Sequence, residues 1–420
     1  MFSDYRGIPW QARLLIYISF IPNIAIGFIY TDLTFFLSDV QGLGAFLAAA
    51  TITVMGATLV LTSIPLGIVA DRYGRRKMLV LGNLCSSLSL IGFALTTNFA
   101  LLILVGILEG TGEAAYAVSV GALLAEKAGD RKRTPAFSLL AFLGWVAGAL
   151  GGFAISSVLA LQTIGLNGRE AHMALYVVVA LLSLSITPLM FRIGESSMLA
   201  KPGEKKGFLP HKSAKVLKRY SIYSVTIAVG AGLFVPLMLV WFGAAYGVAD
   251  TTSGPVLGLT NLLTAGVVFM SPRLARKFGL VKAVVLTQGI STIFMVAVPS
   301  APTFAIAATV YTIRVFLMNL SNPLTQSLIM GLVSPDERGI ASGIAASLWR
   351  LPNALTTLAG GALISAGFLS LPFYIATVLY AIGISLLWFF FKDARLPEEM
   401  PKGGQPPIQP SSLEGPEVER

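Results

Sequence analysis

Five ionisable side chains lie inside long apolar runs of this chain, and they are the residues best suited to do chemistry: Asp32, Glu109, Glu113, Arg314 and Arg350. If those runs cross a membrane, each charge at a helix centre costs about 2.5–3.5 kcal/mol. Five unpaired charges would then cost on the order of 10 kcal/mol or more, comparable with the stability of a whole domain. We therefore expect these residues to pair or to face a wet cavity, where acids take up protons and arginines bind anions.

The depth of these residues indicates which of them could meet. Glu109, Arg314 and Arg350 each lie about eleven residues into an apolar run, near its middle. Glu113 follows Glu109 by one helical turn, about 6 Å along the axis. Two such carboxylates disfavour each other's ionised form, so one of them is expected to hold a proton near neutral pH. Asp32 lies nearer the outer end of the first run. Static salt bridges that hold helices in register are the alternative interpretation.

Residues for other kinds of chemistry are scarce in the sequence. There is no nucleophile–base pattern, phosphate-binding loop or metal-ligand spacing, so we expect no enzyme, no catalytic residue and no cofactor. His172 and His211 are far apart in sequence and lack companions, so no metal site is expected. The single cysteine, Cys85, excludes a disulfide within the chain.

The elements that carry these residues are predicted to be membrane helices. The 420 residues are 55% hydrophobic and only 12% charged, about half the charged share of a soluble domain. Apolar runs of roughly 20 residues recur along the chain, as transmembrane helices require. We predict an all-α membrane protein with twelve spans, at roughly 13–37, 45–69, 78–97, 99–125, 136–160, 172–192, 220–246, 255–272, 280–298, 303–331, 339–366 and 372–391.

The basic residues predict how these spans are oriented. Of the 30 Lys and Arg residues, 27 fall at the termini or in alternate connections, whereas Arg169 lies in an opposite connection and Arg314 and Arg350 lie within spans. Positive charge gathers on the cytoplasmic side of membrane proteins. Both termini are therefore expected in the cytoplasm. The net charge of +10 reflects orientation in the lipid bilayer, and no nucleic-acid partner is expected.

The chain is predicted to consist of two six-helix halves. The N-terminal bundle covers 1–193, a cytoplasmic linker 194–219 with a surface helix over 212–219, and the C-terminal bundle 220–392. Residues 393–420, rich in Pro and acids, are predicted to form a disordered cytoplasmic tail. A shift of 205 residues aligns Glu109 with Arg314 and Trp145 with Arg350, which favours an internal repeat.

One loop carries a specific motif. Residues 67–77, here called the signature loop, read G-x-x-x-D-R-x-G-R-R-K between two spans. The pattern resembles the loop between helices 2 and 3 of the major facilitator superfamily. That resemblance implies two six-helix bundles around a central cavity and alternating access by rocking of the halves. It also implies a conformational latch in which Asp71 contacts Arg75. The latch is formed by Gly67, Asp71, Arg72, Gly74, Arg75 and Arg76.

The resemblance also predicts which residues face the cavity. In this family helices 1, 4, 7 and 10 line it, so Glu109 and Glu113 would face Arg314 across the pseudo-twofold axis. These three residues, with Asp32 and Arg350, are the candidates for proton coupling or substrate binding. Further candidates for the cavity wall are Tyr30, Trp145, Trp241, Tyr311 and Asn319.

Two motifs of the drug/proton antiporter branch are present in incomplete form. Gly106 stands where such antiporters carry an arginine in helix 4. The helix 5 glycine ladder keeps Gly144, Gly148 and Gly152, but Ala149 replaces its proline. The pattern is closest to that branch without matching it fully.

Three functions follow from these observations. The first is a multi-pass secondary transporter of the cell membrane that exports amphipathic or lipophilic small molecules in exchange for protons and acts as a monomer. The second is a transporter of an anionic metabolite, a carboxylate or phosphate, bound by Arg314 and Arg350. The third, a non-transporting receptor with the same fold, is a minor alternative.

Overall fold

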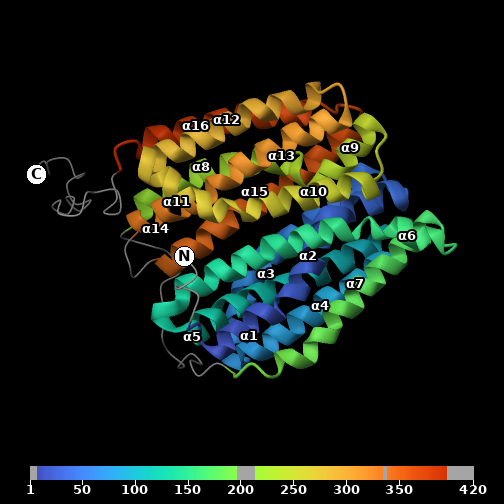
Figure 1. Cartoon of the computed structure of the whole chain (residues 1–420), viewed down its shortest axis with the longest axis horizontal. Helices are drawn as coiled ribbons and strands as arrows, with labels where there is room; N and C mark the ends of the chain where they lie inside the picture. The colour runs from blue at the N-terminus through green and yellow to red at the C-terminus, as the bar shows by residue number, and fades with distance from the viewer. Residues whose placement is uncertain (1–6, 196–212, 334–337, 395–420) are drawn as a thin grey trace, which may run out of the picture.

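The computed structural model describes residues 7–195, 213–333 and 338–394, and all regular structure in these ranges is helical (Figure 1). The predicted all-α membrane class is confirmed. In the described ranges, ten helical segments are long and apolar enough to span a membrane. The other two predicted spans, 255–272 and 339–366, coincide with a helix pair broken at Gly266 and with one helix of 28 residues. The total of twelve spans stays a prediction.

In the first half of the chain, the described helices α1 to α7 lie together on one side of the molecule (Figure 1). In chain order the elements are α1 (Trp10–Ile18), α2 (Phe20–Phe35), the π-helical turn η2 (Phe36–Val40), α3 (Ala45–Tyr73), α4 (Arg75–Leu95), α5 (Phe99–Ala154), α6 (Ser157–Thr163) and α7 (Gly168–Met190).

The second half forms the opposite side (Figure 1). Its elements are α8 (Ala214–Gly232), the short turn η3 (Val235–Leu237), α9 (Met238–Tyr246), α10 (Asp250–Ala265), α11 (Val267–Phe278), α12 (Leu280–Ala297), the turn η4 (Val298–Ser300), α13 (Phe304–Leu320), α14 (Asn322–Leu332), α15 (Arg338–Ser365) and α16 (Leu371–Phe391).

Helix boundaries differ from the predicted spans where the backbone bends. A proline lacks the N–H of a helical hydrogen bond and its ring clashes with the preceding turn. Accordingly, Pro236 lies in η3 between α8 and α9, and Pro323 lies in the first turn of α14, just after α13 ends. The span 99–125 and most of the span 136–160 fall within α5, which consists of two helices that meet at a kink at Gly129.

The predicted linker and tail lie mostly outside the described residues. Residues 196–212 and 395–420 are among those not described, so the linker and the tail stay predictions. The expected surface helix over 212–219 was wrong for its described part: residues 214–219 are the first turns of α8 and continue directly into it. The helix continues because an apolar run follows without a proline or glycine break until Gly230.

The two halves pack most closely at the end opposite the signature loop, here called the distal end. There a Cβ on Gly152 of α5 would lie 2.8 Å from the Cα of Gly258 in α10. Such contacts require glycine, because small residues let membrane helices approach backbone to backbone. Hydrogen bonds between the halves also gather from mid-helix towards this end: Thr34 to Pro236, Phe46 to Ser365, Thr53 to Ala354 and Ser156 to Thr251.

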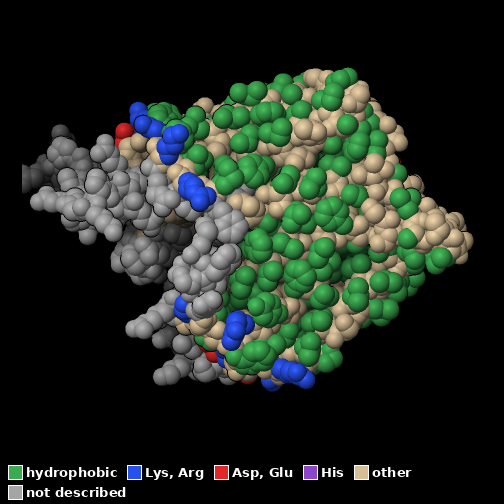
Figure 2. All heavy atoms as spheres, viewed as in Figure 1, with side chains coloured by type: hydrophobic (Ala, Val, Ile, Leu, Met, Phe, Trp, Pro, Cys, Tyr) green, Lys and Arg blue, Asp and Glu red, His purple; other side chains and the backbone are tan. Residues whose placement is uncertain are grey.

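The surface has the polarity of a membrane protein. Figure 2 shows hydrophobic side chains over most of the visible face, with Lys and Arg near one end. Many large apolar side chains are exposed along the helices, among them Leu61, Ile293 and Phe389 at about 70% exposure. Exposed apolar surface of this extent has a favourable environment only in lipid.

Candidate functional site

A cavity of about 780 Å³ lies between the two halves. Its wall combines aromatic residues, amides, hydroxyls and two arginines. Residues of α2 and α5 form one side, and residues of α8, α10, α13, α14 and α15 form much of the other. The polar members of the wall are Asn23, Tyr30, Thr31, Tyr220, Tyr223, Ser224, Thr260, Asn261, Gln288, Tyr311, Arg314, Asn319, Asn322, Thr325, Gln326, Arg350 and Tyr380.

An ion pair joins the two halves at the cavity. Glu113 of α5 accepts a hydrogen bond from Arg350 of α15, with 2.8 Å between Oε1 and Nη1. The other carboxylate oxygen of Glu113 accepts a hydrogen bond from the Tyr30 hydroxyl of α2 at 2.6 Å. The glutamate side chain is only 6% exposed, whereas the arginine side chain is 42% exposed towards the cavity. Both oxygens of the buried acid are therefore satisfied, one of them from the opposite half.

Arg314 lies on the cavity wall without an acid partner. Within the described part of the chain it makes no ion pair, although the residue is only 3% exposed. Its Nη2 donates to the Tyr380 hydroxyl at 2.7 Å, and its guanidinium lies 5.0 Å from the ring centre of Phe234 and 5.2 Å from that of Tyr380. Nε has no hydrogen-bond partner. Aromatic faces attract the cation but leave it uncompensated by a negative charge.

The predicted pairing of Glu109 and Glu113 with Arg314 was wrong. Glu113 instead contacts Arg350. Glu109, only 1% exposed, points away from the cavity into the first half, where Ser89 of α4 donates a hydrogen bond to it. Helical geometry explains the error, because residues one turn apart share a face only approximately and here the two acids contact different helices.

Four of the five aromatic and amide residues predicted for the cavity wall lie on it: Tyr30, Trp145, Tyr311 and Asn319. Trp241 does not. Its indole is 1% exposed, packs against Phe373 at 4.8 Å and donates to the Leu369 carbonyl at 2.8 Å. The break at η3 begins a new helix, α9, just before Trp241 and changes the face that this residue presents.

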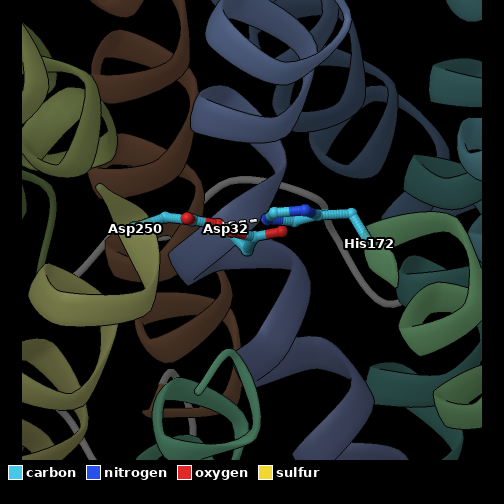
Figure 3. Close-up of side chains that lie close together, drawn as sticks. All are labelled: Asp32, His172 and Asp250. Atoms are coloured by element: carbon cyan, nitrogen blue, oxygen red, sulfur yellow. Dashed lines mark hydrogen bonds and ion pairs between the residues drawn. The ribbon is translucent and has the colours of Figure 1, made fainter. Parts of the chain in front are cut away.

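Asp32 belongs to a second buried cluster at the distal end. Figure 3 shows its side chain with His172 of α7 and Asp250 of α10, all three pointing towards one another. His172 Nε2 contacts the Asp250 carboxylate, which makes this a link between the halves. The expectation that His172 has no companions was therefore wrong: its partners are remote in sequence and adjacent in space. Asp250 was not among the predicted site residues, because it falls between the predicted spans 220–246 and 255–272.

The signature loop forms a turn in which two basic residues, Arg75 and Arg76, contact acids of the first half. Gly74, with φ of 116°, separates α3 from α4. Arg75 pairs with Glu126 of α5 at 3.4 Å. Arg76 donates its backbone N–H to Glu195 at 3.0 Å, and its side chain lies 3.8 Å from the same carboxylate. The side chain of Asp71 lies outside the described residues, so its predicted contact with Arg75 stays a prediction.

The remaining loop positions have simpler surroundings. Gly67 has open space where a Cβ would lie, and Arg72 is exposed. At Gly74, in contrast, a Cβ would lie 2.7 Å from Glu195 Oε2. Glycine is favoured here by the positive φ, whereas the flexible Glu195 side chain could move to make room for a Cβ. Glu126 and Glu195 were missed in the sequence, where nothing distinguishes them from other acids near helix ends.

Comparisons with known proteins agree with this architecture. A family described as Major Facilitator Superfamily matches residues 12–357. Solved structures of similar fold include the nucleoside transporter NupG (TM-score 0.73, 13% identity, 92% of this chain and 100% of that chain). A human organic anion transporter, MFSD10 (TETRAN), has a TM-score of 0.64 and 15% sequence identity, over 92% of this chain and 99% of that chain. A D-xylose-proton symporter has a TM-score of 0.72 and 12% sequence identity, over 92% of this chain and 98% of that chain. No curated protein matches the sequence of this chain.

Proposed function

Because the chain belongs to the Major Facilitator Superfamily, we propose that it moves a small organic anion across the membrane by alternating access of its two halves. Family and fold make it a transporter and not an enzyme. The observation that carries the substrate class is Arg314, a buried cation on the cavity wall without an acid partner among the described residues.

The surroundings of Arg314 favour an anionic ligand. A buried guanidinium without a counter-charge is unfavourable, and the Tyr380 hydrogen bond with two aromatic faces offsets only part of that. A carboxylate or phosphate in the cavity would supply the missing charge and accept planar, paired hydrogen bonds. The polar wall, with Asn261, Gln288 and Asn319, suits the remaining polar groups of such a substrate.

The Glu113–Arg350 pair supports a coupling role. It joins the halves, borders the cavity and leaves the arginine partly exposed. A proton on the carboxylate, or a substrate anion beside the guanidinium, would weaken the pair and lower the barrier to separation of the halves. Protons are therefore the proposed coupling ion. We also propose that the signature loop is a cytoplasmic latch. Its residues Arg75 and Arg76 form ion pairs with Glu126 and Glu195, respectively.

A binding experiment tests the proposal. Purified full-length protein in detergent is titrated with monocarboxylates, dicarboxylates and phosphate esters at constant ionic strength, and the melting temperature is recorded. We expect at least one anion to raise it, and Arg314→Gln to weaken that anion's binding more than tenfold. Arg219→Gln is the matched control, because Arg219 also stacks on an aromatic ring, Phe390, but lies outside the cavity wall. Unchanged anion binding in Arg314→Gln contradicts the proposal.

Export of amphipathic compounds in exchange for protons is the second candidate. Aromatic rings on the cavity wall favour it, in particular Tyr30, Trp145, Tyr311 and Trp349. The same titration separates the two. Stabilisation by neutral or cationic lipophilic compounds, with no response to any anion, would select this candidate in place of the first.

A further inference from the structure

The distal cluster of Asp32, His172 and Asp250 has the composition of a metal site. One ligand atom from each residue lies within 4.8 Å of those of the other two. The three side chains come from α2, α7 and α10 and converge on one point (Figure 3). All three residues are buried, at 0%, 4% and 2% exposure. Water therefore does not compensate the two acids.

The contacts of His172 place one ring nitrogen against the acids, where it could act as a metal ligand. Nδ1 lies 2.7 Å from the Gly168 carbonyl oxygen, which can only accept, so Nδ1 carries a proton. Nε2 then points towards the Asp250 carboxylate. A backbone carbonyl on the remote ring nitrogen is the usual way in which a metal-binding histidine is oriented. Phe36 stacks on the imidazole at 5.8 Å and fixes the plane of the ring.

The charges and the unpartnered oxygens of the cluster suit a cation that touches all three residues. Both carboxylate oxygens of Asp32 lack a hydrogen-bond partner although the residue is fully buried. A proton on His172 Nε2 would satisfy Asp250 alone and leave Asp32 without a partner. A divalent ion at the centre of the cluster would contact both acids and the imidazole together, and it would neutralise both negative charges.

We propose that Asp32, His172 and Asp250 bind one divalent transition-metal ion, with Zn²⁺ as the best match. Imidazole and carboxylate together favour zinc and its neighbours, whereas Mg²⁺ and Ca²⁺ favour all-oxygen sites. Zinc ligands at about 2.0–2.2 Å lie roughly 3.3–3.6 Å apart in a tetrahedron. Side-chain adjustments of about 1 Å suffice to bring atoms within 4.8 Å to that spacing, and the fourth position is left for water.

The site joins the two halves, and this gives the metal a consequence for transport. Asp32 and His172 belong to the first half and Asp250 to the second. The three ligands meet only when the distal end is closed, so a bound ion would stabilise that state by its differential affinity. This consequence depends on the alternating access proposed above. Metal binding itself does not depend on it.

Metal binding is tested on purified full-length protein in detergent. After dialysis against ZnCl₂ we expect about one zinc per chain by metal analysis, and Co²⁺ should give a visible absorption band that excess Zn²⁺ removes. His172→Gln and Asp250→Asn should each weaken zinc binding more than tenfold, since even the partners of metal ligands contribute about 10–100-fold. Asp39→Asn is the matched control, because this exposed aspartate lies at the same end outside the cluster.

Several outcomes would overturn the site. These are an absence of stoichiometric zinc, equal affinity in the two ligand variants and the wild type, or equal stabilisation by Mg²⁺. The Co²⁺ spectrum of the wild type keeps the test valid if a variant fails to fold. Transport in vesicles is measured separately with and without external Zn²⁺, and slowing is expected. Zinc binding without slowing would contradict the link to alternating access and leave the metal site standing.

Discussion

Two arginines of the second half border the same cavity and have opposite surroundings. Arg350 of α15 pairs with an acid from the other half, whereas Arg314 of α13 is enclosed by Phe234 and Tyr380 of its own half. The first is neutralised by the protein and remains partly exposed. The second is buried with its charge uncompensated. Their difference separates two tasks: one arginine joins the halves, and the other is available to a ligand.

The largest expected effect comes from removing the paired arginine. Arg350→Gln leaves Glu113 buried with only Tyr30 as a partner. The free energy of unfolding should fall by about 3 kcal/mol, the lower part of the range for broken buried pairs. Thermal unfolding in detergent measures the change.

Removing the acid of the same ion pair is the control for the difference in burial between Glu113 and Arg350. Glu113→Gln should cost about 1 kcal/mol, because Arg350 is 42% exposed and can be hydrated in the cavity. The double variant should be more stable than Arg350→Gln alone. Equal losses from the two single variants would mean that the burial difference has no energetic consequence.

A smaller effect is expected from Tyr30, which donates a hydrogen bond to the glutamate of this ion pair. Tyr30→Phe removes the hydroxyl that donates to Glu113 at 2.6 Å, and a hydrogen bond to a charged group contributes about 1.5–3 kcal/mol. We expect a loss of about 1.5 kcal/mol in unfolding experiments. Tyr246→Phe is the control, since its hydroxyl donates to a neutral carbonyl, that of Ala301, at 2.9 Å. A loss no greater than that of the control would contradict a charged Glu113 in this state.

The smallest effect on stability is expected at the unpaired arginine. In Arg314→Gln the lost hydrogen bond and ring contacts are offset by removal of a desolvated charge. The unfolding free energy should change by less than about 1 kcal/mol in either direction. A loss as large as that of Arg350→Gln would show that Arg314 is structural, and the contrast between the arginines would fail.

The sequence allowed the helices and the buried charges to be predicted, but not their pairing. Long apolar runs and the signature loop are local patterns, so the all-α class and the family follow from them. Which acid contacts which arginine depends on how each helix is rotated about its axis. A break such as that at Pro236 changes the face on which the residues that follow it in the same span lie. The contact between His172 and Asp250 was not predicted for a related reason, because 78 residues separate them and only the packed halves bring them together.

The glycine contact between α5 and α10 has a practical consequence. At the distal end the backbones of Gly152 and Gly258 are in direct contact, so a methyl group added at Gly152 would push the two halves apart. Gly152→Ala would disfavour closure of that end while leaving the cavity wall chemically intact. Such a variant would favour the conformation in which the distal end is open, and it would allow the structure of that conformation to be determined.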